Sequence, residues 1–155
     1  MKIISGSVKD TMALGAEIAK SANPGDIICL YGNLGSGKTV LAKGIAKGLG
    51  VDPDSVISPT FVILRPYDTR PQLYHFDFYR LASIKDIELL GLEEYLYSNA
   101  ISVIEWPERM GKLLPKEFLM VKLDIKSGNT RRLTIKGKGK SYSAAAKKIY
   151  ANIRN

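Results

Sequence analysis

The stretch Gly32-Asn33-Leu34-Gly35-Ser36-Gly37-Lys38-Thr39 decides how this chain folds. It fills every fixed position of the pattern G-x-x-x-x-G-K-[ST], in which glycines let the main chain curl so that its N–H groups meet the phosphates of a nucleotide. Lys38 supplies a positive charge for the β- and γ-phosphate oxygens, and the hydroxyl of Thr39 is placed to bind the accompanying Mg²⁺. The pattern predicts a phosphate-binding loop, or P-loop, with nucleotide contacts at Gly32, Gly35, Ser36, Gly37, Lys38, Thr39 and Val40.

The residues on either side of this loop have the order that the motif requires. Residues 26–31 form a short apolar run of strand length, and residues 40–49 are apolar at helical spacing and end at Gly50. The loop therefore runs into the start of a helix, whose dipole favours anions. A glycine-rich turn that binds nothing is the alternative, and this context disfavours it.

Size and composition favour one α/β domain spanning residues 1–155. The chain is 45% hydrophobic and 25% charged, which suits a single cored unit. No stretch is apolar for long enough to cross a membrane, and the first residues lack the apolar segment of a signal peptide, so we expect a cytoplasmic protein with no membrane partner. Cys29 lies inside the apolar run before the P-loop and is interpreted as a packed small hydrophobe without a redox role.

The formal charge of +8 is unevenly distributed along the chain. Residues 111–155 contain twelve Lys and Arg against two Asp and Glu, whereas residues 1–110 contain eleven against thirteen. A basic surface of this size suits RNA or an acidic partner, and a solvated lysine-rich face is the alternative.

Two β-hairpins are expected, the first from residues 61–67 and 72–79, with turn-forming residues between them. In its second strand the alternation places Tyr74, Phe76 and Phe78 on one face and His75, Asp77 and Tyr79 on the other, with Arg80 just beyond. A carboxylate within an aromatic strand is costly to bury unless it is paired or beside a metal, so Asp77 is a candidate for chemistry. His75 is interpreted as a structural residue, with a role in catalysis as the alternative. The hydroxyl of Thr60, before this hairpin, either senses the γ-phosphate or ends a loop.

Glu105 ends a compact apolar strand at residues 100–104 and is a second candidate. A carboxylate at the carboxyl end of a buried strand is typical of the Walker B position, where it holds Mg²⁺ directly or through water. Trp106, which follows, either stacks near the site or packs as an ordinary aromatic residue.

The remaining pattern predicts a mixed sheet flanked by helices. We expect a short edge strand at residues 2–4, helices at 7–20, 84–96 and 141–154, and an antiparallel hairpin on the sheet's margin from residues 118–126 and 131–136, followed by a basic loop at 137–140. Together with the P-loop, this order predicts an α/β three-layer P-loop NTPase-like fold, with a mixed sheet, antiparallel hairpins and flanking helices.

Six ordered motifs resemble those of the TsaE family, also called YjeE. They are Ser7-x-x-x-Thr11-x-x-Leu14-Gly15, the P-loop, Ser58-Pro59-Thr60-Phe61, His75-Phe76-Asp77-Phe78-Tyr79-Arg80, Glu88-Leu89-Leu90-Gly91 and Val103-Ile104-Glu105-Trp106-Pro107. The resemblance covers nearly the whole chain, and six ordered matches are more specific than any one of them.

The resemblance implies an ATPase required for the threonylcarbamoyl modification of adenosine 37 in tRNAs that read codons beginning with A. It implies Thr39 and Glu105 as Mg²⁺ ligands, Lys38 and the loop backbone as the phosphate site, and Asp77 as the residue needed for hydrolysis. It also implies two partner proteins, TsaB and TsaD, with ATP used to reset their complex between turnovers.

The residues themselves leave several alternatives open. Asp77 and Glu105 could exchange roles, with Asp77 on the metal and Glu105 on the water. The protein could instead be a small-molecule kinase built on the same loop, with Arg131 and Arg132 as the candidates for its arginine-rich lid. Alternatively, it could be a non-enzymatic module in which ATP binding alone gates a contact with protein or RNA. The basic C-terminal segment is a candidate tRNA contact.

Overall fold

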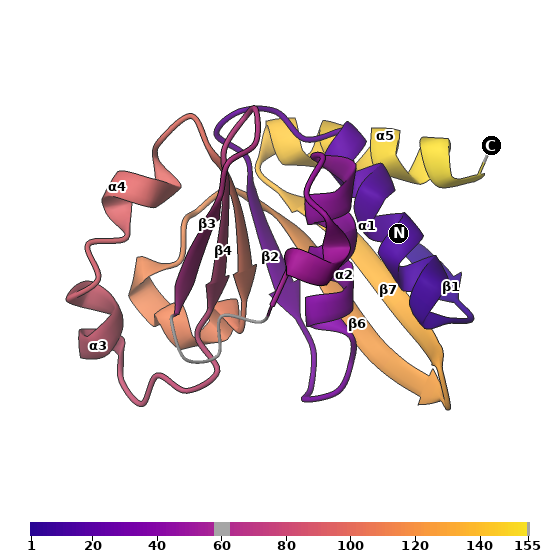
Figure 1. Ribbon diagram of the computed structural model, residues 1–155, viewed down its shortest axis with the longest axis horizontal. Helices are drawn as coiled ribbons and strands as arrows, with labels where there is room; N and C mark the ends of the chain where they lie inside the picture. The colour runs from indigo at the N-terminus through magenta and orange to yellow at the C-terminus, as the bar shows by residue number, and fades with distance from the viewer. Residues whose placement is uncertain (58–62, 155) are drawn as a thin grey trace.

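The computed structural model describes residues 1–57 and 63–154, in which the strands form one seven-stranded sheet ordered β1-β7-β6-β2-β5-β4-β3 (Figure 1). The strands are β1 (Lys2–Ser5), β2 (Ile27–Tyr31), β3 (Leu64–Tyr67), β4 (Leu73–Asp77), β5 (Ile101–Glu105), β6 (Phe118–Ser127) and β7 (Thr130–Lys138). The helices are α1 (Val8–Lys20), α2 (Lys38–Gly48), α3 (Ile84–Glu88), α4 (Glu93–Leu96) and α5 (Lys140–Arg154), with 3₁₀ segments η1 (Pro53–Ser55) and η2 (Pro107–Leu113).

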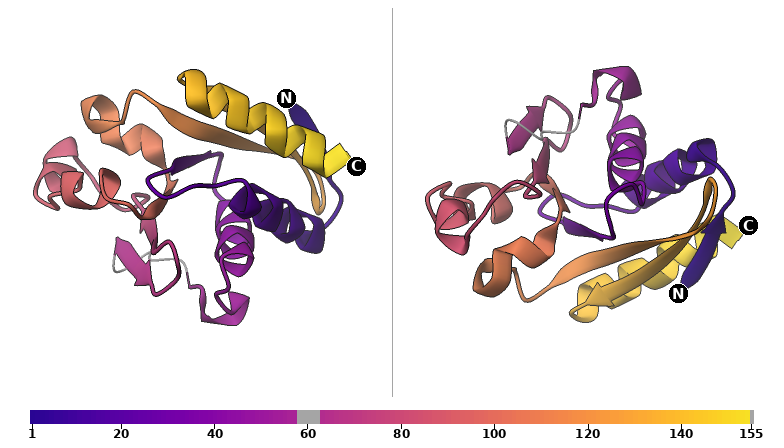
Figure 2. Two further views of the ribbon diagram at one scale, coloured as in Figure 1. Left: turned by 90° about the horizontal axis from the view of Figure 1, so that it is seen from above. Right: turned by 90° about the horizontal axis from the view of Figure 1, so that it is seen from below.

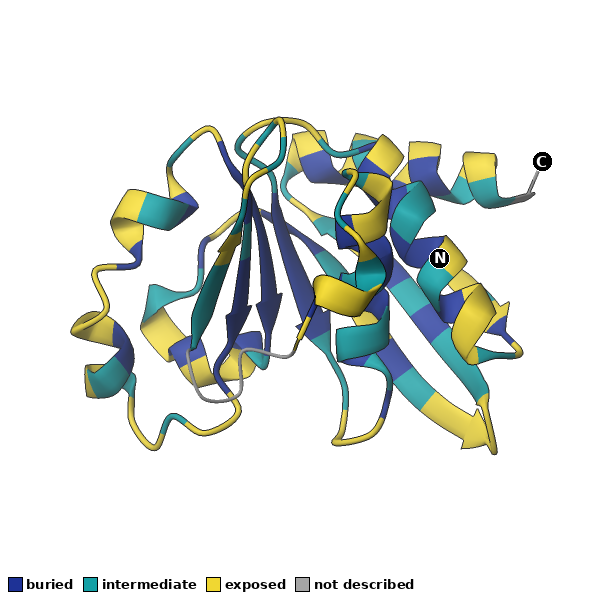
Figure 3. Ribbon diagram, viewed as in Figure 1, coloured by how far each residue is buried: buried dark blue, intermediate teal, exposed yellow. Residues whose placement is uncertain are grey.

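Four neighbouring strands of the sheet run parallel, and the strands on either side of these four pair antiparallel. β6, β2, β5 and β4 run in one direction, while β3 pairs antiparallel with β4, and β7 pairs antiparallel with both β6 and β1. The central strands are buried, as expected for parallel strands covered on both faces (Figure 3). The predicted α/β fold with a mixed sheet and flanking helices is confirmed.

Two groups of helices cover the two faces of the central strands (Figure 2). One core cluster joins α1, α2 and α5 to side chains such as Leu30 and Val103, and the other joins α3, α4 and η2 to Phe76 and Ile104. Because alternate residues of each strand point to opposite faces, the same strands supply both clusters. Among the described residues no helix is long and apolar enough to cross a lipid bilayer.

Helices α1 and α2 pack closely because glycines line their contact. A Cβ added to Gly15 would meet the carbonyl oxygen of Leu41, and one added to Gly44 would meet the carbonyl oxygen of Met12. α1 begins where expected, since the Ser7 side chain accepts a hydrogen bond of 3.0 Å from the backbone N–H of Asp10. α1 therefore packs closely against the helix that begins at the P-loop.

Two expectations about the sheet need correction. The β6–β7 hairpin does not lie on the margin, because β6 pairs with β2 and the edge beyond β7 is taken by β1. The expected basic loop at residues 137–140 is shorter, since β7 continues to Lys138 and α5 starts at Lys140. Hydrophobic alternation identifies these strands but does not state which strand lies beside which. The prediction for Thr60 falls outside the described residues.

Candidate functional site

The P-loop connects the carboxyl end of β2 to the first residue of α2, as predicted. Gly35 has φ +75° and Gly37, the residue that caps α2, has φ +100°, a left-handed backbone that side-chain-bearing residues rarely adopt. These angles turn the chain sharply enough to present the first N–H groups of α2 at one end of the sheet. The strand, glycine turn and helix follow one another in the order that the sequence predicts, and N–H groups at the start of a helix can bind anions.

Lys38, the first residue of α2, is almost completely buried. Its Nζ donates hydrogen bonds to the carbonyl oxygens of Gly32, at 2.7 Å, and Asn33, at 3.1 Å. Burial lowers the pKa of the Lys38 ammonium below its usual value, and the carboxylates of Glu105, Glu108 and Asp77 oppose that shift. A cation in this setting would be stabilised by an arriving phosphate.

Two carboxylates from neighbouring parallel strands converge on the loop. Asp77 ends β4 and Glu105 ends β5, and the two residues are direct partners in the strand register. The Thr39 hydroxyl donates a 3.0 Å hydrogen bond to Glu105 Oε2, which joins the P-loop helix to β5. Asp77 Oδ1 accepts a 3.0 Å hydrogen bond from the backbone N–H of Tyr79. The structure therefore brings Lys38, Thr39, Asp77 and Glu105 together.

His75 contacts the site directly, which the interpretation of this residue as structural does not anticipate. Its Nε2 lies 2.9 Å from Glu105 Oε1, and both side chains are buried. Glu105 is thus held at both oxygens, by Thr39 on one side and His75 on the other. The alternation within β4 already places His75 on the same face as Asp77, but only the pairing of β4 with β5 reveals its partner.

The donor set suits a hard divalent cation. Mg²⁺ prefers oxygen ligands and is usually held by one or two protein groups together with nucleotide phosphates. A hydroxyl and a carboxylate, from Thr39 and Glu105, stand within hydrogen-bond distance of each other beside the phosphate loop. These two residues fit the predicted metal position, and Asp77 lies next to them.

A cleft of about 470 Å³ opens above these groups. Trp106, whose backbone is left-handed at φ +58°, places its ring 3.9 Å from Lys38 Nζ and 5.0 Å from the Tyr79 ring, measured to ring centroids. Trp106 therefore covers the lysine. The cleft is lined by Leu34, Gly35, Gly37, Lys38, Thr39, Val40, Asp77, Tyr79, Arg80, Glu105 and Trp106.

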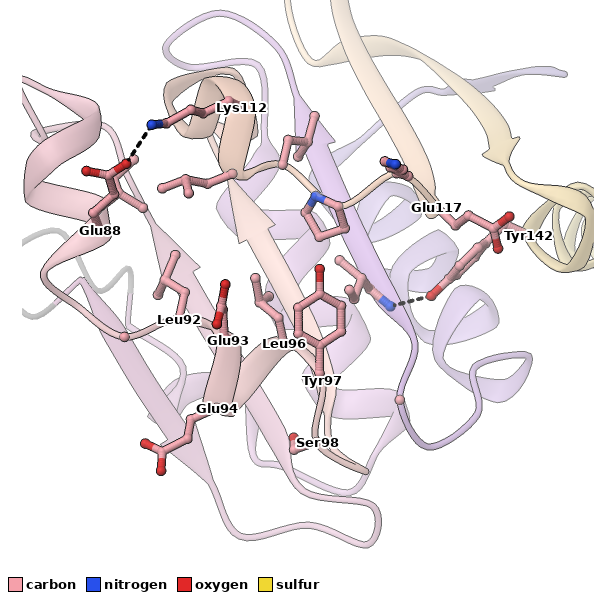
Figure 4. A pocket seen from close by; sticks show the side chains of 18 residues that line it. Glu88, Leu92, Glu93, Glu94, Leu96, Tyr97, Ser98, Lys112, Glu117 and Tyr142 are labelled. Atoms are coloured by element: carbon pink, nitrogen blue, oxygen red, sulfur yellow. Dashed lines mark hydrogen bonds and ion pairs between the residues drawn. The ribbon is translucent and has the colours of Figure 1, made fainter.

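A larger hollow of about 1,100 Å³ lies elsewhere, among α3, α4, η2 and the start of α5 (Figure 4). Glu88 forms an ion pair with Lys112 at 3.0 Å on one side, and Tyr142 accepts a hydrogen bond from the backbone N–H of Ile27 on the other. Of the predicted site residues that the structure describes, none lines this hollow. Lys38, Thr39, Asp77 and Glu105 line the smaller cleft instead.

Known proteins resemble this chain over most of its length. A family model described as "Threonylcarbamoyl adenosine biosynthesis protein TsaE" matches residues 5–133. Proteins called tRNA threonylcarbamoyladenosine biosynthesis protein TsaE match from Treponema pallidum, at 37% identity over 87% of this chain and 99% of the relative, and from Bacillus subtilis, at 35% over 95% and 93%. The crystal structure of Bacillus subtilis YdiB superposes with a TM-score of 0.86 at 31% identity, covering 100% of this chain and 96% of that one. The resemblance inferred from the six motifs is confirmed, and the chain belongs to the TsaE family.

Proposed function

We propose that this protein is a Mg²⁺-dependent ATPase. The observation that carries the proposal is the convergence of Lys38, Thr39, Asp77 and Glu105, from one loop and two strands, on a single cleft. Phosphoryl transfer needs mainly positioning and neutralisation of negative charge, and these residue types supply both.

Each group has a distinct role in the proposed reaction. Lys38 and the loop amides bind the phosphates, and Asp77 orients the attacking water or accepts its proton as the oxygen attacks the γ-phosphorus and ADP leaves. Thr39 and Glu105 would hold Mg²⁺, which when bound neutralises charge on the phosphate oxygens. His75 fixes the orientation of the Glu105 carboxylate.

ATP is preferred to GTP in this proposal because the sequence contains no N-K-x-D motif for reading guanine. We expect slow hydrolysis by the protein alone. The sequence contains no arginine finger at a recognisable spacing: Arg80 lines the cleft directly after β4, and Arg131 is engaged by backbone carbonyls of the P-loop instead. An arginine that reaches the transferred phosphate typically contributes about 10³–10⁵ in rate, so partner proteins that complete the site should accelerate turnover.

Family membership supports a biological role in tRNA modification. We propose that the ATPase supports threonylcarbamoylation of adenosine 37 in tRNAs that read codons beginning with A, acting in the cytoplasm with TsaB-like and TsaD-like proteins and resetting their complex between turnovers. The names of the Treponema and Bacillus relatives support the pathway. Exposed lysines of β7 and α5, among them Lys138 and Lys147, support a direct contact with tRNA.

The test is ATPase activity measured with and without both partners and tRNA. We expect slow turnover alone, stimulation by the partners, and loss of turnover in Lys38→Ala under both conditions. Turnover that is unaffected by the partners would contradict the proposed place in the modification system, and turnover retained by Lys38→Ala would contradict the proposed site.

The alternatives give different results in the same assay. Transfer of labelled phosphate to an acceptor other than water would identify a kinase. Full support of tRNA modification by both Lys38→Ala and Asp77→Asn would make nucleotide chemistry irrelevant to the role. A direct tRNA contact through the basic segment predicts that the affinity for tRNA falls steeply with added salt.

A further inference from the structure

Arg131, near the start of β7, reaches from the β6–β7 hairpin to the outer side of the P-loop. Its Nε donates a 3.0 Å hydrogen bond to the carbonyl oxygen of Ser36, and its Nη2 donates a 3.3 Å hydrogen bond to that of Gly35. These contacts join residues more than ninety positions apart in the sequence. The P-loop and the β6–β7 turn lie at the same end of the sheet (Figure 1), so a side chain from one can support the other.

The hairpin holds the same guanidinium in place. Nη1 of Arg131 donates to the carbonyl oxygens of Gly128, at 2.6 Å, and Thr130, at 3.2 Å. A role confined to the hairpin would need only these two contacts, yet two further donors of the same group go to the loop. The planar fork of a guanidinium, with donors at fixed angles, suits such bridging better than the single ammonium of lysine.

The direction of these hydrogen bonds matters for phosphate binding. Peptide N–H and C=O groups point in opposite directions, so holding the Ser36 carbonyl fixes the peptide unit whose N–H belongs to Gly37, at the start of α2. The peptide unit that carries the Gly35 carbonyl supports the loop from within, because its N–H, that of Ser36, donates to the carbonyl oxygen of Asn33 at 3.1 Å. Lys38 also binds loop carbonyls, those of Gly32 and Asn33, but its ammonium must turn to an arriving phosphate. The contacts of Arg131 lie outside the cleft and can persist when nucleotide binds.

We infer that Arg131 is a positioning residue that holds the P-loop in its phosphate-binding shape and links that shape to the β6–β7 hairpin. The inference rests on the proposed nucleotide site. It assigns Arg131 to nucleotide affinity rather than to the chemical step, because the guanidinium does not line the cleft and is already engaged by four carbonyls.

The test compares Arg131→Ala and Arg131→Lys with Arg132→Ala. Arg132 is the matched control, because it lies next to Arg131 on β7 but pairs with Asp124 of β6, at 3.0 Å, instead of the P-loop. We expect Arg131→Ala to weaken the affinity for both ATP and ADP by about tenfold, with kcat at saturation changed less than about threefold. The nucleotide affinity of Arg131→Lys should lie between those of wild type and Arg131→Ala. The affinity of Arg132→Ala should stay within about twofold of wild type.

Hydrogen exchange supplies a readout that needs no nucleotide. The amides of residues 33–38 should exchange faster in Arg131→Ala than in wild type or Arg132→Ala, at equal global stability. Affinity and exchange in Arg131→Ala equal to those of wild type would overturn the inference while leaving the nucleotide site intact. A large fall in kcat with unchanged affinity would also overturn it, because it would make Arg131 a direct participant in catalysis. Absence of nucleotide binding in wild type would instead refute the proposed function.

Discussion

At the scale of single residues, the site depends on how one carboxylate is held. Glu105 accepts from the Thr39 hydroxyl at one oxygen and contacts His75 at the other, so its position is fixed from both sides. Asp77, its neighbour in the register, accepts a hydrogen bond from the backbone N–H of Tyr79. The proposal gives the metal role to Glu105, beside the Thr39 hydroxyl, and the water role to Asp77.

Substituting the two carboxylates separately tests these roles. Asp77→Asn should lower kcat by about 10²–10⁴-fold with nearly unchanged affinity for Mg·ATP, because a group that acts on the attacking water contributes mainly in the transition state. Glu105→Gln should weaken both Mg²⁺-dependent binding and turnover. Equilibrium titration alongside steady-state kinetics measures both quantities, and the reverse pattern would mean that the roles are exchanged.

His75 marks the limit of what the sequence predicts at this scale. The P-loop residues follow from a local motif, because eight consecutive residues build the whole loop. The partner of His75 lies thirty positions away in sequence on β5. That contact depends on β4 lying beside β5 in a particular register, which the alternation of residues within one strand does not contain.

At the scale of elements, the close packing of α1 against α2 holds the helix that begins at the P-loop. Gly15 and Gly44 allow the two helix backbones to approach, and a side chain at either position would meet a backbone carbonyl of the other helix. The sequence predicts both helices from their period, but the closeness of their contact becomes visible only in three dimensions.

Gly44→Ala should therefore destabilise the protein, although alanine favours helices. The added methyl would meet the backbone of Met12, so the helices must separate, and we expect a loss of about 1–3 kcal/mol in the free energy of unfolding. Lys47→Ala, an exposed change on the same helix, is the control and should stay within about 0.5 kcal/mol. Urea unfolding measures both variants. Equal stability of Gly44→Ala and wild type would show that the pair tolerates wider spacing.

Tyr31 of β2 makes the free energy of unfolding depend on pH in the alkaline range. Burial, together with Cys29 and Glu108 nearby, raises the pKa of Tyr31 from 10.0 to about 12. Below pH ~10 the phenol is neutral in both states and the full stability is present. As the pH rises from ~10 towards ~12 the unfolded chain ionises first, so stability should fall. Urea unfolding at several pH values should show a shallower fall in Tyr31→Phe, and the same slope in both proteins would contradict this assignment.

At the scale of the whole molecule, the P-loop, the carboxyl ends of β4 and β5, and the turn of the β6–β7 hairpin lie at one end of the sheet. Parallel strands place their carboxyl ends together, which is why Asp77 and Glu105 meet the P-loop. The expected fold class follows from the sequence, whereas the insertion of β6 between β2 and β7 does not. That insertion brings Arg131 to the P-loop and gives the C-terminal part of the chain a contact with the candidate nucleotide site.

Calorimetric titration of a slowly hydrolysed ATP analogue with Mg²⁺ tests the central claim most directly. The account predicts binding of one nucleotide per chain by wild type, and loss of that binding in Lys38→Ala, whose folding is checked by circular dichroism. Absence of binding by wild type, or binding retained at full strength by folded Lys38→Ala, would contradict the assignment of residues 32–39 as the nucleotide site.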